Sequence, residues 1–345
     1  MPDAFVDLRS DTVTMPTQPM LEAMVSAPLG DDVLGDEPTV IALQEKVARL
    51  LGKEASCFVP SGTMANLTAI KSLTQPGDEI IAEAGSHFFR YESGAFAAVA
   101  GCSVNLIPGN RGMITPEEIE QHLRPRNVHF PPSRLLCLEN THNAGGGAVW
   151  PLDKIKAVTS KARELGLRCH LDGARLMNAS VKTGVSPREY AELFDTVSMC
   201  FSKGLGAPVG SIVAGDKETI RRVHRFRKMF GGAMRQSGIL AAAAIYALDH
   251  HVHRLAEDHA NATRLAESFA EIPFLQLEPE NVETNIIYFS LDSARMTAAE
   301  LVRKLEQKGI RMLAVGRQTL RAVTHLGIDE KDIERTITEV KAVLK

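Results

Sequence analysis

The sequence lacks any stretch of about 18 apolar residues, which is the length that a membrane-spanning helix requires. Its first residues, "MPDAFVDLRSDTVT", also lack the cationic region followed by an apolar one that marks a secretory signal. Neither a membrane span nor a secretory signal is therefore predicted, and we expect a cytosolic protein.

The sequence has no strong excess of one charge, because 39 Lys and Arg residues face 42 Asp and Glu residues, a net charge of −3. This balance excludes a general attraction to nucleic acid or to anionic membranes. The one cationic cluster is "RRVHRFRKMFGGAMR". A nucleic-acid-binding module built on that cluster is an alternative, and it predicts salt-dependent retention of DNA. We instead expect a small molecule or another subunit as the partner.

Paired cysteines are also missing, because the five cysteines lack the short spacing of a zinc site or a redox motif. Most of them lie in apolar, strand-like runs, so we predict reduced core residues. The histidine-rich segment "DHHVH" and His259 have no acidic or cysteine ligands to complete a metal site, and we predict a solvated helix there and no metal. The five cysteines are Cys57, Cys102, Cys137, Cys169 and Cys200.

The sequence does contain a regular alternation of short apolar runs and longer amphipathic segments between about residues 55 and 215. The strand-like runs are "ASCFV", "DEIIAE", "CSVNLI", "RLLCLE", "LRCHLD", "DTVSMCF" and "GSIVAG". Helical spacing lies between them, as in "MANLTAIKSL", "TPEEIEQHL" and "PLDKIKAVTSKARELG". This alternation predicts an α/β fold with a mostly parallel, seven-stranded sheet, whose binding residues cluster at the carboxyl ends of the strands.

A long helical stretch over residues 237–270 follows, and beyond it the pattern is that of a compact α+β unit. We therefore predict an N-terminal arm at residues 1–30, a large domain at 31–250 and a small C-terminal domain at 251–345. The sequence has no internal repeat and no low-complexity tract.

Three predicted strand ends carry unusual residues. After "ASCFV" come Ser61, Gly62 and Thr63 before a helix, where free backbone N–H groups would suit a phosphate or where a simple N-cap would form. After "LRCHL" comes Asp172, with an arginine three residues later that would form either a functional site or a structural ion pair. After "VSMCF" comes Lys203 in a glycine-rich turn, although lysine is rarely buried without a partner.

These three strand ends together meet the needs of pyridoxal phosphate. This cofactor requires a lysine for a Schiff base, an acidic partner for its pyridine nitrogen and an anion site for its phosphate. The glycines around Lys203 would let the backbone pass close to the ring. A nicotinamide enzyme on a parallel sheet is the competing interpretation, but "GLGAPVG" has the wrong spacing and precedes a strand-like run instead of a helix.

At this point the sequence resembles the low-specificity L-threonine aldolases, which are fold-type I pyridoxal phosphate enzymes. The resemblance rests on "LRSDTVT", "GDDVLGDEPTV", "FVPSGTMAN", "LENTHN", "HLDGARLMNA", "SKGLGAPVGS", "GGAMRQSGILAA" and "LRAVTHL", which follow the order of the family over nearly the whole chain. It implies a large domain with the seven-stranded sheet and a small C-terminal α+β domain. The run "AGGGAVWP" after "ENTHN" resembles one branch of the family and leaves the substrate preference open.

The resemblance also implies roles for individual residues. Lys203 carries the cofactor, Asp172 pairs with its pyridine nitrogen, and Gly62 and Thr63 bind its phosphate. His87 stacks on the cofactor ring. The residues that hold the substrate carboxylate are Ser10, Arg175 and Arg321.

Other positions complete the implied site. His87 or His129 meets the β-hydroxyl of the substrate, for which a neutral imidazole is a suitable proton acceptor, and Tyr91 is a weaker candidate on the loop of His87. Read without the resemblance, each histidine is a hydrogen-bonded loop residue. Arg235, and with less support Lys228, lies beside the phosphate of a neighbouring subunit's site. The implied assembly is a homotetramer built from two catalytic dimers.

The resemblance thus implies an aldolase that cleaves L-threonine or L-allo-threonine to glycine and acetaldehyde. A β-eliminating lyase or an amino-acid racemase remains an alternative. The same residues around the cofactor could serve either reaction, because the cofactor does the difficult chemistry and the site selects the bond that breaks.

Overall fold

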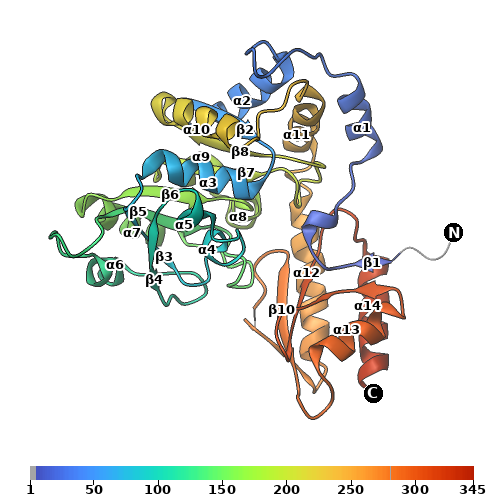
Figure 1. Cartoon of the computed structure of the whole chain (residues 1–345). Coiled ribbons are helices and arrows are strands. Elements are labelled where there is room, and N and C mark those ends of the chain that lie inside the picture. Colours follow the sequence, from blue (N-terminus) through green and yellow to red (C-terminus); the bar gives the residue numbers. More distant parts are fainter. Residues whose placement is uncertain (1–4, 280) are drawn as a thin grey trace.

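The computed structural model of the chain describes residues 5–279 and 281–345, so residues 1–4 of the predicted arm lie outside it. Its main feature is a seven-stranded sheet with the order β2-β8-β7-β6-β5-β3-β4 (Figure 1). Only β8 runs antiparallel to its neighbours in this sheet. The strands are β2 (Ala55–Val59), β3 (Glu79–Glu83), β4 (Ser103–Ile107), β5 (Ser133–Glu139), β6 (Arg168–Asp172), β7 (Thr196–Cys200) and β8 (Ser211–Gly215). The predicted α/β fold with a mostly parallel seven-stranded sheet is confirmed.

Helices cover both faces of this sheet. On one face, α3 (Gly62–Leu73) and α10 (Lys217–Met229) pack on β2 and β8, while the short α4 (His87–Arg90) and α5 (Ala95–Ala98) lie near β3. On the other face, α2 (Pro38–Leu51), α7 (Leu152–Glu164), α8 (Leu176–Thr183), α9 (Pro187–Ala191) and α11 (Gly238–His250) share the largest apolar core with the sheet. α6 (Pro116–His122) packs on α7, and α1 (Gln18–Val25) packs on α11.

Local sequence explains where several of these helices begin and end. The Ser61 hydroxyl caps α3, and the Asp216 carboxylate caps α10, each by accepting a backbone N–H of the first turn. Thr115 and Glu118 form a capping box at the start of α6. Gly52 ends α2 in the left-handed conformation that glycine adopts without steric cost.

The C-terminal part forms a second core. A four-stranded antiparallel sheet has the order β12-β13-β10-β9. Its strands are β9 (Leu275–Leu277), β10 (Ile286–Leu291), β12 (Leu313–Ala314) and β13 (Thr319–Val323), and its helices are α12 (Leu255–Ala270), α13 (Ala298–Glu306) and α14 (Glu330–Leu344). The break between α11 and α12 spans residues 251–254, where the sequence places the domain boundary.

The start of the described chain joins this C-terminal core. β1 (Val6–Asp7) pairs in parallel with β11 (Ile310–Arg311), and Val6 and Leu8 are buried among the apolar residues of the C-terminal domain. The chain then passes the short 3₁₀ helix η1 (Asp11–Val13) and runs along α1 toward the large domain (Figure 1). The N-terminal segment therefore connects the two cores.

The prediction of a solvated helix at "DHHVH" and His259 is wrong at two positions, His251 and His259. His251 is buried, and its Nδ1 lies 2.7 Å from the carbonyl oxygen of Leu205 in the turn that follows Lys203. His259 is buried too, with its Nε2 3.2 Å from the side-chain nitrogen of Asn178. Both histidines support the surroundings of the predicted site, His251 through the turn after Lys203 and His259 through the packing of α12 against α8.

All five cysteines are buried free thiols, as predicted. Among the described residues, no helix is both long enough and apolar enough to cross a membrane.

Candidate active site

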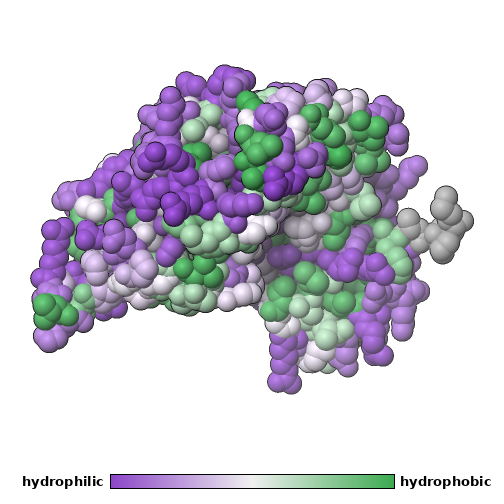
Figure 2. Space-filling view, turned by 45° about the horizontal axis from the view of Figure 1, so that its top comes forward, coloured by the Kyte–Doolittle hydropathy of each residue, from purple (hydrophilic) through white to green (hydrophobic). Residues whose placement is uncertain are grey.

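The carboxyl ends of the central strands bring the predicted residues into one region, where the large domain meets the C-terminal domain (Figure 1). β6 ends at Asp172, β7 leads into the turn of Lys203, and β2 leads into the start of α3. The molecular surface is hollowed where these two domains meet (Figure 2). This is the edge of the sheet at which open α/β proteins bind their ligands.

Asp172 is buried, with a side chain that accepts two hydrogen bonds. Its Oδ2 accepts from the Asn66 side chain at 2.7 Å, and its Oδ1 accepts from the backbone N–H of Ala174 at 3.1 Å. Burial opposes ionisation of this carboxyl, but the charges of His87 and Lys203 prevail and lower its pKa. The site therefore holds a buried carboxylate that is suited to a cationic partner.

Lys203 lies in a turn that several groups hold in place. Its carbonyl oxygen accepts hydrogen bonds from Gly206 N–H at 2.8 Å and from the Thr14 hydroxyl at 3.1 Å. Gly206 has φ +80°, and a Cβ there would lie 2.9 Å from Leu326, so the turn requires glycine at this position. The backbone that carries the Lys203 amine is consequently fixed between the two domains.

The start of α3 has both the N-cap and the free N–H groups that the sequence left as alternatives. The Ser61 hydroxyl accepts from the Met64 N–H at 3.2 Å, which is a normal N-cap. The N–H groups of Gly62 and Thr63 are the first in the helix and have no intrahelical acceptor by geometry. A Cβ on Gly62 would lie 2.8 Å from the Cys200 sulfur, so only glycine fits against the end of β7.

His87 begins α4 and lies next to Asp172. Its Nδ1 is 2.9 Å from Glu92 Oε1, and its backbone N–H donates to Glu139 Oε2 at 2.8 Å. Burial opposes the charged imidazolium, but the hydrogen bond to Glu92 and nearby carboxylates outweigh it and raise the pKa of His87. Ligand atoms of His87, Glu92 and Asp172 lie within 4.8 Å of one another, and hydrogen bonds among these residues and Asn66 account for this spacing without a cation.

Arg175 forms an ion pair, but with a residue other than the nearby Asp172. Its Nε and Nη2 each donate to the Asp11 carboxylate at 2.7 Å. Burial opposes the charge on Asp11, and Arg175 overcomes this penalty and lowers the pKa of that carboxyl far below its usual range. The Nε–Nη2 edge of the Arg175 guanidinium is thus committed to the protein itself.

Arg321 extends from β13 of the C-terminal domain toward the large domain. Its Nη1 donates to the Asn143 side chain at 3.2 Å and its Nη2 to the carbonyl oxygen of Arg9 at 3.1 Å. Its Nε is buried and has no hydrogen-bond partner among the described residues. Because an unpartnered buried donor is costly, Arg321 is well placed to receive an anion. The adjoining Ser10 hydroxyl accepts from the Thr12 N–H at 3.3 Å.

Comparison with known proteins agrees with this geometry. The family model of the beta-eliminating lyases matches residues 7–292. The chain is 41% identical over 340 residues to the low specificity L-threonine aldolase of Escherichia coli, covering 98% of this chain and 99% of that protein. It is 40% identical over 338 residues to low-specificity L-threonine aldolase 1 of Arabidopsis thaliana, covering 96% and 94%.

This chain belongs to the low-specificity L-threonine aldolase family. The fold agrees as well: the solved structure of a threonine aldolase from Leishmania major superimposes with a TM-score of 0.85 at 20% identity, covering 99% of this chain and 100% of that one. The implied fold-type I architecture is therefore confirmed, and pyridoxal phosphate is the cofactor of this threonine aldolase family member.

The residues present fit that cofactor. A buried carboxylate at Asp172, a lysine held beside it and two free N–H groups at the start of a long helix match its pyridine nitrogen, its aldehyde and its phosphate.

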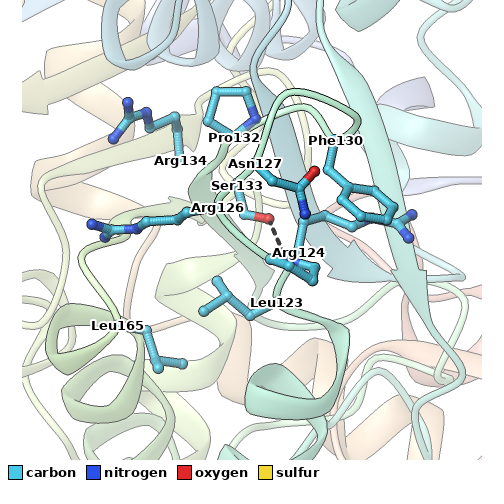
Figure 3. Close-up of a pocket in the computed structure, with 10 residues that line it drawn as sticks. Leu123, Arg124, Arg126, Asn127, Phe130, Pro132, Ser133, Arg134 and Leu165 are labelled. Carbon is cyan, nitrogen blue, oxygen red and sulfur yellow. Dashed lines mark hydrogen bonds between the residues drawn. The ribbon is translucent and has the colours of Figure 1, made fainter.

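His129 is the predicted residue that the fold of this threonine aldolase places elsewhere. It is exposed on the loop before Ser133, which enters β5 at its amino end. Seven residues of β5, at about 3.3 Å per residue, separate that end from Glu139 at the site by about 20 Å. The loop borders a cavity of about 340 Å³ that Figure 3 shows between Leu165 and the arginines 124, 126 and 134. Within one chain, His129 and His87 therefore lie at opposite edges of the sheet.

The cationic candidates Arg235 and Lys228 point outward in this chain. Arg235 is more than half exposed and donates to the Asp31 carboxylate at 2.9 Å. Lys228 is exposed on the last turn of α10. Tyr91 is also exposed, with its ring centroid 5.4 Å from that of His87.

Four residues of the site had escaped the sequence analysis. Three of them lie inside motifs that had been quoted for other residues, and Glu92 follows His87 by five positions. Each has a hydrogen-bond partner 26 to 178 residues away along the chain, although Glu92 also contacts the nearby His87. The four are Asp11, Asn66, Glu92 and Asn143.

Proposed function

We propose that this chain is a pyridoxal phosphate-dependent aldolase that cleaves L-threonine and L-allo-threonine, and related β-hydroxy-α-amino acids, to glycine and an aldehyde, which is acetaldehyde for threonine. The observation that carries the proposal is the buried Asp172 carboxylate beside Lys203 and His87 at the carboxyl ends of the strands. When bound, the cofactor supplies the electron sink for cleavage of the Cα–Cβ bond.

The chain's own residues hold the cofactor in three places. The Lys203 amine forms the covalent bond to the cofactor aldehyde, and Asp172 keeps the pyridine nitrogen protonated because opposite charges favour each other's charged form. The N–H groups of Gly62 and Thr63 hold the phosphate at the positive end of α3.

Other residues orient the amino acid. Arg321, through its unpartnered Nε, and the Ser10 hydroxyl hold the α-carboxylate. Arg175 contributes its positive charge from the ion pair with Asp11. Fixing the carboxylate would orient the amino acid so that one particular bond to Cα is selected for cleavage. His87 accepts the proton of the β-hydroxyl, directly or through a water molecule, as the aldehyde leaves.

The reaction is tested by incubating the holoenzyme with L-threonine and L-allo-threonine separately. We expect glycine and acetaldehyde in equal amounts from both substrates. Release of 2-oxobutyrate and ammonia would instead indicate β-elimination, and conversion to the D-amino acid without cleavage would indicate a racemase. Steady-state rates on the two diastereomers establish the preference.

We also propose that the enzyme is a homotetramer of two catalytic dimers whose sites are shared between copies. Apolar side chains are exposed around α1 and the segment that follows it, in a region where Figure 2 shows hydrophobic surface. Such a patch favours contact with another subunit. Arg235, Lys228 and His129 are exposed in their own chain and are proposed to serve a neighbour's site. The apolar residues are Met15, Leu21, Val25, Leu29 and Leu34.

A mixing experiment tests the shared site. Lys203→Ala and Arg235→Ala are each expected to be nearly inactive alone. Co-assembled, they are expected to regain part of the activity, because one mixed site contains both wild-type residues. The same design with Lys203→Ala and His129→Ala tests His129. Absence of complementation in verified mixed assemblies, with both variants folded, would contradict the shared site.

The compartment is proposed to be the cytoplasm. Five free thiols buried in the core fit a reducing compartment, where disulfides are rare. Cell fractionation with antibody detection tests this placement.

A further inference from the structure

The Asn66 side chain occupies the centre of the buried hydrogen-bond network behind the site. Its Oδ1 accepts from the Ser198 hydroxyl at 2.9 Å and lies 3.2 Å from His170 Nε2. Burial lowers the pKa of His170 to about 4, so this ring is neutral, and its Nδ1 is engaged with the Thr196 hydroxyl at 2.8 Å. Both groups can donate to the Asn66 oxygen, and the carboxylates on the other side of the amide, which can only accept, determine its orientation.

With that orientation, the Asn66 NH₂ group must face the opposite side, where two buried carboxylates lie. It donates to Glu92 Oε1 at 2.8 Å and to Asp172 Oδ2 at 2.7 Å. One amide thus separates two acids that would otherwise repel each other. It also fixes Glu92 in a place from which it reaches a third group, His87.

Glu92 determines what the His87 ring can do. Glu92 is buried and follows α4 by one residue, and its Oε1 lies 2.9 Å from His87 Nδ1. A carboxylate can only accept hydrogen bonds, so the hydrogen must be on Nδ1. The other nitrogen, Nε2, then has a free lone pair. The backbone of His87 is held independently, because Glu139 accepts its N–H at 2.8 Å.

We propose that Glu92 is a positioning residue of this enzyme, which fixes the ring orientation and the Nδ1–H tautomer of His87 and so leaves Nε2 as the nitrogen that accepts the substrate proton. The inference rests on the proposed aldolase function for its catalytic consequence, but the Glu92–His87 contact exists independently of it. A carboxylate behind a histidine base acts in the same way in other enzymes, where its replacement by an amide favours the wrong tautomer.

The charged groups around His87 agree with this role. Glu92 faces the ring from beyond the end of α4, Asp172 from the end of β6 and Glu139 from the end of β5, and each raises the pKa of His87. Burial acts in the opposite direction and is the largest single influence. Without the Glu92 charge, fewer groups oppose the effect of burial, and the pKa of His87 falls.

The first measurement follows the histidines of the holoenzyme by NMR with ¹³C-labelled imidazole rings, as a function of pH, with His87→Gln to assign the signal. We expect His87 to titrate above its ordinary value of 6.5 in the wild type and to carry its neutral-state hydrogen on Nδ1. In Glu92→Gln we expect the titration to move to lower pH, because the opposing effect of burial is then less fully balanced.

The second measurement is the rate of threonine cleavage against pH. In Glu92→Gln we expect kcat to fall about 100-fold, the lower end of the range for proton-transfer groups, with KM for threonine changed less than about threefold. The acid limb of the pH profile should move to lower pH together with the NMR titration. Glu92→Asp, which keeps the charge on a shorter side chain, should recover part of the rate.

Glu79→Gln is the matched control. Glu79 is an equally buried glutamate at the amino end of β3, where its partners are Arg124, Ser133 and Asn105. Its replacement should leave the His87 titration and the pH profile unchanged.

An unchanged His87 pKa and tautomer in Glu92→Gln would overturn the proposal, as would wild-type kcat in that variant. If Glu92→Gln does not fold, Glu92→Ala decides, because a His87 signal and a rate like those of the wild type in a variant without the carboxylate would exclude a positioning role. A wild-type enzyme that releases no acetaldehyde would refute the proposed function, whereas the NMR measurement would still test the Glu92–His87 contact on its own.

Discussion

Two buried glutamates lie at opposite edges of the large sheet, Glu79 at the amino end of β3 and Glu139 at the carboxyl end of β5. Glu79 accepts from the side chains of Arg124 at 3.1 Å and Ser133 at 3.0 Å. Glu139 instead accepts two backbone N–H groups, those of His87 and Asn143, each at 2.8 Å. One carboxylate is neutralised by a neighbouring cation, whereas the other holds two segments that carry functional side chains.

The difference shows why the chemistry gathers at one edge. At the carboxyl ends, strands lead into loops and helix starts whose N–H groups converge, so a carboxylate there can organise several segments at once. At the amino ends, the arriving loops bring exposed arginines around the 340 Å³ cavity (Figure 3). The presence of a cavity is therefore not enough to identify the functional edge.

The strongest test of the carboxyl edge is Lys203→Ala. We expect loss of the yellow colour of the bound cofactor and of all but trace turnover, about 10³-fold or more, because this residue makes the covalent bond. Borohydride reduction of the wild type followed by peptide mapping identifies the modified lysine. A pyridoxyl group on a different lysine would contradict the assignment.

Asp172→Asn should have the next largest effect. The neutral amide no longer stabilises the protonated pyridine nitrogen, so we expect kcat to fall by about 10²- to 10³-fold, a loss typical of removing one preorganised electrostatic partner. Some cofactor binding should remain, as measured by absorbance after dialysis. Nearly normal turnover with tightly bound cofactor would make Asp172 a structural residue.

The two edges also predict different costs for removing an arginine. Arg175→Ala leaves the fully buried Asp11 without its ion-pair partner and with one remaining donor, Asn285 at 3.3 Å, so we expect it to lower the free energy of unfolding by about 3–5 kcal/mol. Arg124→Ala leaves Glu79 with two other donors, and we expect about 1–3 kcal/mol. Urea unfolding of both variants measures the difference. A larger loss for Arg124→Ala would contradict the comparison.

The smallest effect concerns pH and the buried pair of Glu83 and His142 at the carboxyl edge, whose side chains are 3.1 Å apart. Burial opposes both charges, but the pairing lowers the pKa of Glu83 from 4.5, and Glu139 and Glu83 raise that of His142 from 6.5. The Glu83 contribution is complete above pH 4.5 and is lost as pH falls through its lowered folded pKa. The His142 contribution is complete below pH 6.5 and is lost as pH rises through its raised folded pKa.

The pair should therefore stabilise the fold most between about pH 4.5 and 6.5. We expect the difference in unfolding free energy between wild type and His142→Gln to be larger at pH 6 than at pH 9. Urea unfolding at the two pH values measures it, with Glu83→Gln as the companion variant. A difference that is the same at both pH values would show that the pair contributes nothing through its charges.

The local pattern was sufficient for much of the fold. The seven apolar runs became the seven strands of the large sheet, and "TPEEIEQHL" and "PLDKIKAVTSKARELG" became α6 and α7. Hydrophobic periodicity and helix caps depend on residues that are close together in the chain, so they can be recognised in a single sequence. The N-terminal segment was harder, because its place beside β11 depends on residues about 300 positions away.

The sequence by itself determined the chemical inventory of the site: a lysine in a glycine turn, an aspartate at a strand end and a helix start suited to an anion. These features are local, because each follows one strand directly. Tertiary structure alone decided that Arg175 pairs with Asp11 and not with Asp172, that His129 lies at the amino edge, and that Asn66 and Glu92 stand behind His87. These partners come from different strands and loops, and only the order of the strands in the sheet brings their side chains within hydrogen-bonding distance.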